Sequence, residues 1–310
     1  MAELRKDYIL DKYVIIAKER AKRPEQFMNE KKSHDVKVDY FASGNEEMTP
    51  PEIGRREDEN GWYLRWFENK FPAVKIKGNP HIETHNEFYT FSDAVGKHEV
   101  IVETPKIDDD LSDLSLSHIK DLLEVYNERI EELEKNYEYV CVFKNHGEKA
   151  GTSIVHPHSQ VVAYNIVPTS VMEKVNACNG EDPYGRIIER EKDSERKVFE
   201  NDAFICFCPY ASRYPLEIIF FPKRYVERLN ELKEIEIFDL AKLLKKVTKK
   251  LKKINAPYNM YIHYAPKGKK LRLQISICPR LVTLAGFEMS SETIINSVPP
   301  EEAAKYYREA

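Results

Sequence analysis

The chain has 310 residues, a formal net charge of −4 at pH 7 and 32% charged residues. This length allows one large domain or two ordinary ones, and the slight acidic excess argues against a nucleic-acid partner. No apolar run approaches the ~18 residues that span a bilayer, and the N-terminus lacks the apolar segment of a signal sequence, so no membrane contact is expected. Five cysteines, an odd number without a Cys-x-x-Cys pair, predict reduced thiols in a cytoplasmic protein.

The first half predicts a long loop and then three strands around one helix. Residues 29–59 are polar and without periodicity, which indicates a loop. A strand from His98 to Glu103 precedes a helix, and strands over 139–144 and 154–163 follow it. The helix is predicted from an apolar stripe at helical spacing, formed by Ile119, Leu122, Leu123, Tyr126, Ile130 and Leu133.

The second half predicts the same series of elements about 118 residues later. A loop over 176–194 precedes a strand over 216–221, and strands over 259–264 and 271–277 end the series. The predicted class is therefore α+β, an internally duplicated fold in which each half, 1–168 and 169–310, is an antiparallel sheet with one principal helix. The second helix has the stripe Leu240, Leu243, Leu244, Val247, Leu251 and Ile254, and the lysines between them indicate a solvated face.

The segment His156-Pro157-His158-Ser159-Gln160 is the strongest functional signal. Apolar, β-branched neighbours predict a mostly buried strand, in which His156, His158 and Gln160 point to one face. Pro157 has no N–H to donate, so this strand is expected to be an edge strand or locally irregular. Buried imidazoles need polar partners, and such a pair could serve as metal ligands, satisfied core groups or catalytic groups.

The chemistry of these side chains suits a phosphate. An imidazole has a pKa near ~6.5, so a neutral nucleophilic nitrogen is present at pH 7 and can form a phosphoramidate. The Gln160 amide can donate to a phosphoryl oxygen. Residues 145–153 supply an amide, hydroxyls and two glycines, whose backbone can approach an anion closely.

The duplication provides an internal control for the two histidines. Where the first half has His156, His158 and Gln160, the second has Gln274, Ser276 and Cys278, within one register step. Only one copy keeps the histidines, so maintaining the fold does not require them, which favours a functional role.

The pattern N-x-G-x(3)-G-x-S-x(2)-HPH-x-Q resembles the active-site signature of the galactose-1-phosphate uridylyltransferase branch of the histidine-triad superfamily. The resemblance extends over nearly the whole chain. It rests on ordered blocks at 20–24, 44–46, 49–52, 69–73, 98–104, 279–280 and 285–288.

This resemblance implies roles for individual residues. His158 would be the nucleophile that carries the nucleotidyl group, and Gln160 would hold the phosphate, where hydrolases of the superfamily carry a third histidine. His156 would assist these two residues at the catalytic site. The substrate-binding residues would be Arg20, Arg23, Asn69, Asn145, Gly151 and Ser153.

The implied activity is transfer of an NMP group between a nucleotide sugar and an acceptor phosphate, with no nucleic acid and no membrane involved. A homodimer is what the family implies. The alternatives are an ADP-glucose or other NDP-sugar phosphorylase that uses inorganic phosphate, a nucleotide-binding module without turnover, and, less favoured because of Gln160, a hydrolase.

The sequence departs from the family at its metal and sugar sites. Asp39, Ala42 and Ile107 stand where many members have zinc ligands, so the expected cofactor content is none, with His156 forming hydrogen bonds instead. At the second metal site only His263 remains, beside Gln274 and Ser276. Where the galactose enzymes hold the hexose phosphate with a tyrosine and a glutamine, this chain has Phe287 and Ile294, so transfer chemistry is better supported than galactose.

Overall fold

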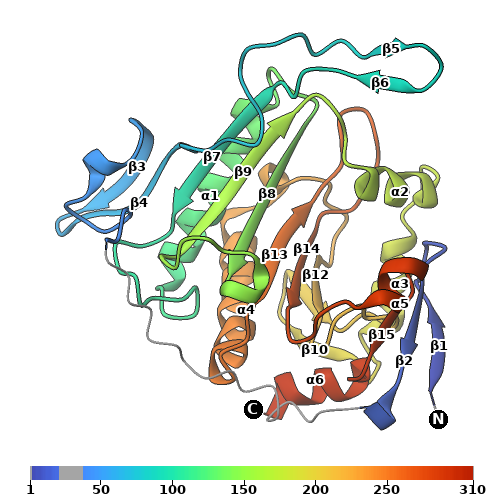
Figure 1. Ribbon diagram of the computed structural model, residues 1–310. Coiled ribbons are helices and arrows are strands. Elements are labelled where there is room, and N and C mark those ends of the chain that lie inside the picture. Colours follow the sequence, from blue (N-terminus) through green and yellow to red (C-terminus); the bar gives the residue numbers. More distant parts are fainter. Residues whose placement is uncertain (1, 21–37, 310) are drawn as a thin grey trace.

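The computed structural model describes residues 2–20 and 38–309, and its main body is a ten-stranded antiparallel sheet (Figure 1). Two long helices, α1 (Leu116–Leu133) and α4 (Glu234–Lys253), pack against each other on one face of this sheet. In order across the sheet, the strands are β10 (Lys197–Glu200), β11 (Phe204–Phe207), β12 (Ile218–Pro222), β14 (Gln274–Pro279), β13 (Tyr258–His263), β8 (Tyr139–His146), β9 (His158–Tyr164), β7 (Gly96–Val102), β4 (Gly61–Glu68) and β3 (Glu52–Asp58).

Smaller elements cover the second half and the ends of the sheet (Figure 1). A three-stranded sheet is formed by β1 (Glu3–Lys6), β2 (Tyr13–Ile16) and β15 (Ile294–Asn296). No helix within the described ranges is long and apolar enough to cross a membrane. The remaining elements are η1 (Lys18–Arg20), η3 (Glu46–Met48), β5 (Glu83–His85), β6 (Tyr89–Phe91), η4 (Glu148–Ala150), α2 (Thr169–Cys178), α3 (Pro183–Glu191), η5 (Leu229–Glu231), α5 (Gly286–Ser291) and α6 (Pro300–Glu309).

The two halves of the large sheet repeat each other about the junction between β8 and β13. Helix α4 begins 118 residues after α1, as the sequence predicts. At the junction Phe143 pairs with Tyr261, and their next partners in the sheet are Gln160 and Ser276. Gln160 therefore corresponds to Ser276, and His158 to Gln274, which is two residues from the predicted alignment. The internally duplicated α+β fold is confirmed.

The core lies between the sheet and the two long helices. The six predicted stripe residues of α1 are all buried, and those of α4 are buried as well. Each fully buried leucine or isoleucine contributes about 1.5–3 kcal/mol, so these stripes fix both helices on one face of the sheet. The other face, away from the helices, is left for the site.

Strand β9 is shorter than predicted and is not an edge strand. It begins at His158 and lies between β7 and β8. Pro157 cannot donate to a ladder, and its carbonyl oxygen accepts from the Glu103 N–H (3.1 Å), so regular pairing starts only after it. His156 therefore precedes the strand, and the Phe41 ring lies against both histidines, with centroids 6.0 Å from His156 and 5.5 Å from His158.

Two predicted loops contain regular structure. Residues 176–194 include the end of α2 and all of α3, which begins with Asp182 as N-cap, its side chain accepting from the Gly185 N–H, and Pro183 in the first turn. This Asp-Pro start is a recognised helix signal that the low periodicity concealed. The described part of 29–59 includes η3 and β3. The mixed charges of β3 hid its pairing with β4.

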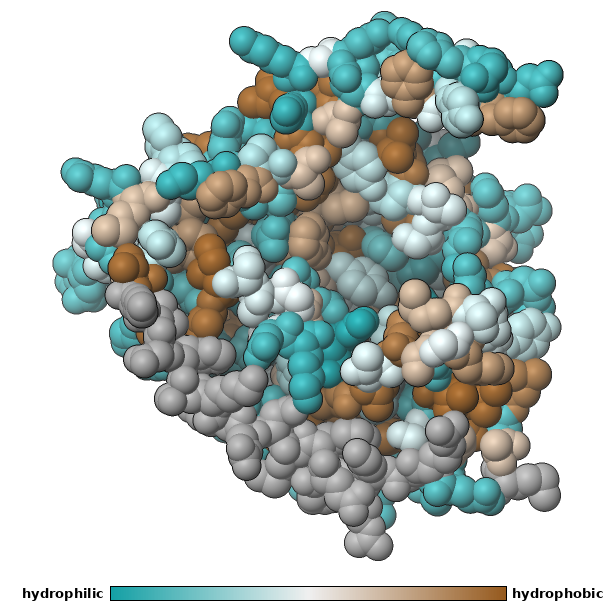
Figure 2. Space-filling view, viewed as in Figure 1, coloured by the Kyte–Doolittle hydropathy of each residue, from teal (hydrophilic) through white to brown (hydrophobic). Residues whose placement is uncertain are grey.

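An arm formed by residues 70–95 extends from the end of β4 and returns into β7 (Figure 1). Its hairpin, β5 and β6, pairs only with itself. Phe71 and Phe88 are 82% and 79% exposed, and Ile82 and Tyr89 are also exposed. Figure 2 shows hydrophobic side chains among hydrophilic ones at the top of the molecule, where Figure 1 places the arm. The arm therefore presents apolar surface that the chain itself does not cover.

Candidate functional site

The candidate site lies on the face of the sheet opposite α1 and α4. Along β9, Ser159 and Val161 are buried toward the helices, so His158 and Gln160 point to the other face. Figure 2 shows this face hollowed below the arm. His158 and Gln160, two residues apart on one strand, are thus brought together as the sequence predicts.

His158 is buried and held in one tautomer. Its Nδ1 lies 2.8 Å from the carbonyl oxygen of His156, which can only accept, so Nδ1 carries the hydrogen. The lone pair of the neutral ring is then on Nε2. Burial lowers the pKa of His158, which keeps the ring neutral at pH 7. The Phe41 ring lies edge-on against it, with 5.5 Å between the ring centroids. Nε2 is consequently the nucleophilic atom that this geometry leaves available.

His156 is fully buried, and hydrogen bonds occupy both of its ring nitrogens. Nε2 lies 2.6 Å from the carbonyl oxygen of Thr104, and Nδ1 lies 2.8 Å from Oδ2 of Asp39. Protein oxygens thus occupy both nitrogens, so neither is directed at a metal in this arrangement. The Asp39 carboxylate stands where the family's zinc site would have a cysteine. His156 is thus anchored between two segments, and its own carbonyl oxygen orients the His158 ring.

The Gln160 side chain lies in a cluster of amide and imidazole groups that the sequence did not reveal. His98, on the neighbouring strand β7, has its Nε2 2.9 Å from Oε1 of Gln160 and its Nδ1 3.1 Å from the backbone N of Ala73. Asn69, at the end of β4, has its Nδ2 3.1 Å from the same Nε2. The structure therefore brings the predicted residues Asn69 and Gln160 together, with His98 between them. His98 begins the block 98–104 of the family resemblance, and its diagonal position across the β7–β9 pair brings it to Gln160.

The segment before β9 forms a turn over the junction of the two halves. Gly147 and Gly151 have φ angles of 83° and 87°, which favour glycine, and they flank η4. A Cβ on Gly147 would also lie 2.8 Å from Pro257. Asn145 lies at the end of β8, and Oδ1 of its side chain accepts from Nδ2 of Asn259. Ser153 is exposed in the same segment.

A buried ion pair lies beneath the nucleophile, on the helix side of the sheet. Lys144 Nζ and Ser159 Oγ both donate to the carboxylate of Glu103, each over 2.5 Å. The Tyr126 hydroxyl lies 2.6 Å from Ser159 Oγ. Burial raises the pKa of Glu103, but Lys144 and Ser159 outweigh this and hold the pKa below its ordinary value. The carboxylate is thus charged and fully bonded directly under His158.

The other predicted residues are placed as follows. Arg20 is the last residue of η1, and Arg23 lies outside the described residues, so the roles predicted for both arginines stay predictions. Phe287 lies on α5 and is 48% exposed, whereas Ile294 is buried in β15. Ile294 therefore packs in the fold and is not a substrate contact.

In the second half, a lysine contacts Gln274, the residue that corresponds to His158. Lys174 of α2 places Nζ 2.6 Å from Oε1 of Gln274 and 3.0 Å from Nδ1 of His263, in a cavity of about 140 Å³. Burial lowers the pKa of Lys174 to about 8. A cation thus bonds the two residues that stand at the family's second metal site. No group of three or more His, Cys, Asp or Glu side chains suited to a metal occurs in the described ranges.

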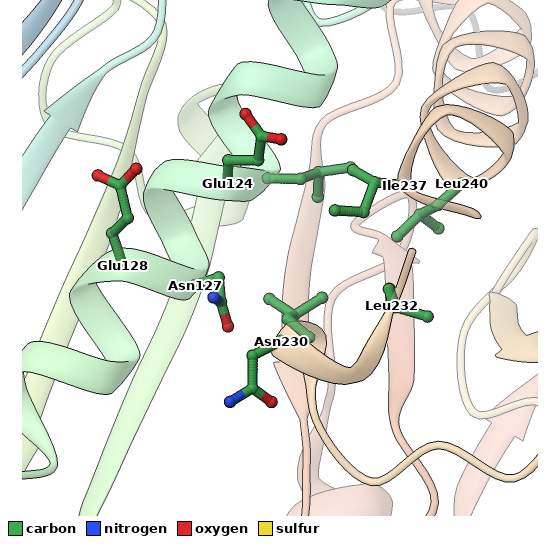
Figure 3. Close-up of a pocket in the computed structure, with 9 residues that line it drawn as sticks. Glu124, Asn127, Glu128, Asn230, Leu232, Ile237 and Leu240 are labelled. Carbon is green, nitrogen blue, oxygen red and sulfur yellow. The ribbon is translucent and has the colours of Figure 1, made fainter. Parts of the chain in front are cut away.

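Another pocket, of about 260 Å³, lies between α1 and α4 (Figure 3). Its two carboxylates have partners, because Glu124 pairs with Lys120 and Glu128 pairs with Arg56. The pocket is on the helix side of the sheet, away from His158 and Gln160, so it is separate from the candidate site.

Comparison with known proteins agrees with this geometry. Residues 1–168 match the family described as galactose-1-phosphate uridyl transferase, N-terminal domain. The chain belongs to the galactose-1-phosphate uridylyltransferase family. Residues 95–307 also match a domain of unknown function, DUF4921. The family relationship makes the chain a nucleotidyltransferase, as the sequence predicts.

Three similar proteins cover nearly the full chain. An ADP-glucose phosphorylase of Arabidopsis thaliana is 33% identical over 99% of this chain and 92% of its own. A galactose-1-phosphate uridylyltransferase of Thermotoga maritima is 28% identical over 100% of this chain and 98% of its own. A crystal structure of an ADP-glucose phosphorylase from Arabidopsis thaliana with bound ADP-glucose superposes with a TM-score of 0.83, at 30% identity, covering 100% of this chain and 99% of the other. Both activities that the sequence suggested thus occur among relatives of similar length.

Proposed function

We propose that this protein transfers an NMP group from a nucleotide sugar to an acceptor phosphate through a covalent NMP–His158 intermediate. One observation carries the proposal. The hydrogen bond from Nδ1 of His158 to the His156 carbonyl leaves the lone pair on Nε2, at the open face beside Gln160. A neutral imidazole held in this way is an activated nucleophile that needs no separate base.

Both half-reactions conserve atoms and charge without a metal or a redox partner. Nε2 of His158 attacks the α-phosphorus, the P–N bond forms, and the bond to the bridging oxygen breaks, releasing a sugar 1-phosphate. A phosphate oxygen of the acceptor then attacks the same phosphorus, and the P–N bond breaks. The amide hydrogens of Gln160 and Asn145 would stabilise the charge on the phosphoryl oxygens in both steps.

The acceptor in the leading proposal is a hexose 1-phosphate, as in the galactose-1-phosphate uridylyltransferases. A second candidate is inorganic phosphate, which would make the enzyme an NDP-sugar phosphorylase. It is favoured by Phe287 and Ile294, which offer no hydroxyl or amide to a sugar phosphate, and by the 33% identity to the Arabidopsis thaliana ADP-glucose phosphorylase.

The test uses UDP-glucose and ADP-glucose, each labelled with ³²P at the α-phosphate. Protein isolated after mixing should carry label that is lost in acid and kept in base, as expected for a phosphoramidate. Adding galactose 1-phosphate or inorganic phosphate should discharge the label, and the faster acceptor identifies the reaction. His158→Ala should remain unlabelled, whereas His85→Ala, an exposed arm histidine, should label like the wild type.

Three outcomes would contradict the proposal. An unlabelled wild type that binds nucleotide in calorimetry would indicate a binding module without turnover. Rapid NMP release in water alone would indicate a hydrolase. Equal labelling of His158→Ala would assign the intermediate to another residue.

We propose further that the protein needs no structural metal. The hydrogen bonds that His156 shares with Asp39 and with the Thr104 carbonyl, and the ammonium of Lys174 between His263 and Gln274, support this. Elemental analysis of purified protein should find well below one equivalent of zinc or iron. One equivalent that is lost in His156→Ala would overturn the proposal.

The proposed assembly is a homodimer in the cytoplasm. The exposed apolar side chains of the arm support association, and sedimentation at micromolar concentration tests it, with a monomer as the contrary result. All five cysteines are free thiols, which suits a reducing compartment.

A further inference from the structure

His98 is a buried histidine that neither the motif nor the proposed mechanism uses, yet its ring contacts the Gln160 side chain. It lies on β7 beside β9, facing the same side of the sheet as Gln160. Its two ring nitrogens contact different parts of the structure. Nδ1 meets the backbone at the base of the arm, and Nε2 meets the two amides of the site.

The backbone fixes the tautomer of this ring. The N–H of Ala73 points at Nδ1 over 3.1 Å, and a backbone N–H can only donate. Nδ1 must therefore hold a lone pair, so the hydrogen of the neutral ring is on Nε2. Burial lowers the pKa of His98, which agrees with a neutral ring. The orientation of the ring is thus imposed by the main chain, which cannot flip as a side-chain amide can.

This tautomer in turn fixes the Gln160 amide. Nε2–H of His98 donates to Oε1 of Gln160 over 2.9 Å. In a flipped amide, the NH₂ group of Gln160 would face Nε2–H instead, so that two donors would oppose each other. The NH₂ group of Gln160 is therefore turned away from His98. The Asn69 amide is fixed in a similar way, because its Oδ1 accepts from the Phe71 N–H. Its Nδ2 is therefore a donor, and the Nε2 of His98, which carries a hydrogen, does not accept from it. The amide nitrogens of Gln160 and Asn69, on either side of His98, thus keep hydrogens for another acceptor.

We propose that His98 is a positioning residue that turns the amide hydrogens of Gln160 toward the phosphoryl group on His158. The Nε2–H tautomer, imposed by the Ala73 backbone, holds Oε1 so that the donor side faces the phosphate. The proposal rests on the proposed nucleotidyl transfer and deepens it. The recognised ligand is a phosphoryl group, whose oxygens accept from Gln160 Nε2 and Asn69 Nδ2. Because Ala73 belongs to the arm, the arm and the phosphate site are joined through one imidazole.

A double-mutant cycle on the first half-reaction tests the proposal. His98→Leu fills the space without a hydrogen bond and should slow NMP transfer to His158 by about 10²-fold, approaching the 10²–10³-fold expected for Gln160→Ala. If the two residues act as one unit, the double variant should be no slower than Gln160→Ala alone. His98→Gln, which can present an N–H near the Nε2 position, should recover most of the rate. The loss should fall on kcat more than on KM.

The control is His263→Leu, which removes a half-buried, hydrogen-bonded histidine from the second half. It should change thermal stability but not the transfer rate. A His98→Leu variant that is folded and fully active would overturn the proposal. Effects of His98→Leu and Gln160→Ala that multiply in the double variant would do so as well.

A second measurement needs no activity and so separates this proposal from the proposed function. In ¹⁵N NMR spectra of the free protein, His98 should show a protonated Nε2 and an unprotonated Nδ1, and His158 the reverse. If the wild type transfers no nucleotide but His98 has this tautomer, the proposed function fails while the positioning geometry holds. A protonated Nδ1 on His98 would overturn the positioning role even in an active enzyme.

Discussion

The side-chain amide of Asn259 donates a hydrogen bond to Oδ1 of Asn145 over 2.8 Å, where the two halves of the sheet meet. The same nitrogen donates to the carbonyl oxygen of Ala150, also over 2.8 Å. Oδ1 of Asn145 is thereby occupied, and its NH₂ group is directed to another acceptor. The half of the chain without the histidines thus contributes to the geometry of the half that has them.

Asn259→Leu should slow the first half-reaction by about 2- to 10-fold, the effect of one hydrogen bond of about 0.5–1.5 kcal/mol. Asn259→Asp should slow it more, because a carboxylate facing Oδ1 would turn the Asn145 amide around. Both effects are measured as burst rates of sugar 1-phosphate release. Asn230→Leu, which removes a surface amide bonded to Glu131, is the control and should keep the wild-type rate. Equal rates for all three variants would show that the Asn145 orientation is irrelevant.

The acid limb of the transfer rate should lie below the ordinary histidine pKa of ~6.5. Burial lowers the pKa of His158, since the protonated ring loses its hydration, while the nearby Lys144 lowers it further and Glu103 raises it. The unprotonated ring is the reactive form, so the rate should hold at pH 6.5 and fall only at lower pH. Burst rates between pH 5 and 8 measure this. A midpoint above 6.5 would contradict the burial argument.

The stability of the fold should decline over the same acidic range. His158 and His98 both have lowered pKa values in the folded state, so the unfolded chain binds their protons more tightly. Their contribution is therefore present above pH ~6.5 and is lost as the pH falls through the folded-state values. Urea unfolding at several pH values tests the sign, and His98→Leu should have a shallower acid dependence than the wild type.

The buried pair of Glu103 and Lys144 predicts a large stability effect for a single substitution. Lys144→Met would leave the Glu103 carboxylate buried with no cation, at a cost of about 3–5 kcal/mol. The double variant Lys144→Met with Glu103→Leu should recover part of this, because no uncompensated charge remains. Chemical denaturation compares the two. Lys245→Met, at a surface lysine bonded to the Leu114 carbonyl, is the matched control and should cost far less. Equal losses for both lysines would exclude a special role for the pair.

Parts of the fold governed by periodicity were predictable from the sequence. The stripes of α1 and α4 and the 118-residue offset follow from local spacing, and both are confirmed. The start of β9 was not predictable, because it depends on a hydrogen bond between the Pro157 carbonyl oxygen and the N–H of Glu103, a residue distant in sequence. His156 was consequently assigned to the strand, which it precedes.

Residues of the site that act through contacts between strands were missed for a similar reason. His98 and Asn259 lie outside the active-site signature, and the pairing of β7 with β9 and of β8 with β13 brings them to Gln160 and Asn145. Helix α3 was missed because its short, charged sequence has few apolar positions. A motif identified the chemistry, whereas sheet register determined which neighbours orient it.

Gln160 should decide whether the NMP group passes to a phosphate or to water. An amide can donate to a phosphoryl oxygen but cannot take a proton, whereas an imidazole can act as a general base toward water. Gln160→His should therefore increase NMP release in water relative to transfer onto an acceptor phosphate. Gln160→Ala should slow both half-reactions by about 10²–10³ without changing this ratio. Folding should change little in either variant, because Gln160 lies on the partly open face of β9.

The measurement follows ³²P-labelled enzyme after the donor is removed. Label released as free NMP is compared with label recovered in a nucleotide sugar or an NDP, over a range of acceptor concentrations. Val162→His places an imidazole two residues further along the same face of β9, opposite His98. It is the matched control and should keep the wild-type ratio. A Gln160→His enzyme with an unchanged ratio would show that the residue at this position does not determine the fate of the intermediate. An increased ratio in both histidine variants would point to water entry through a disturbed strand and away from general-base chemistry at residue 160.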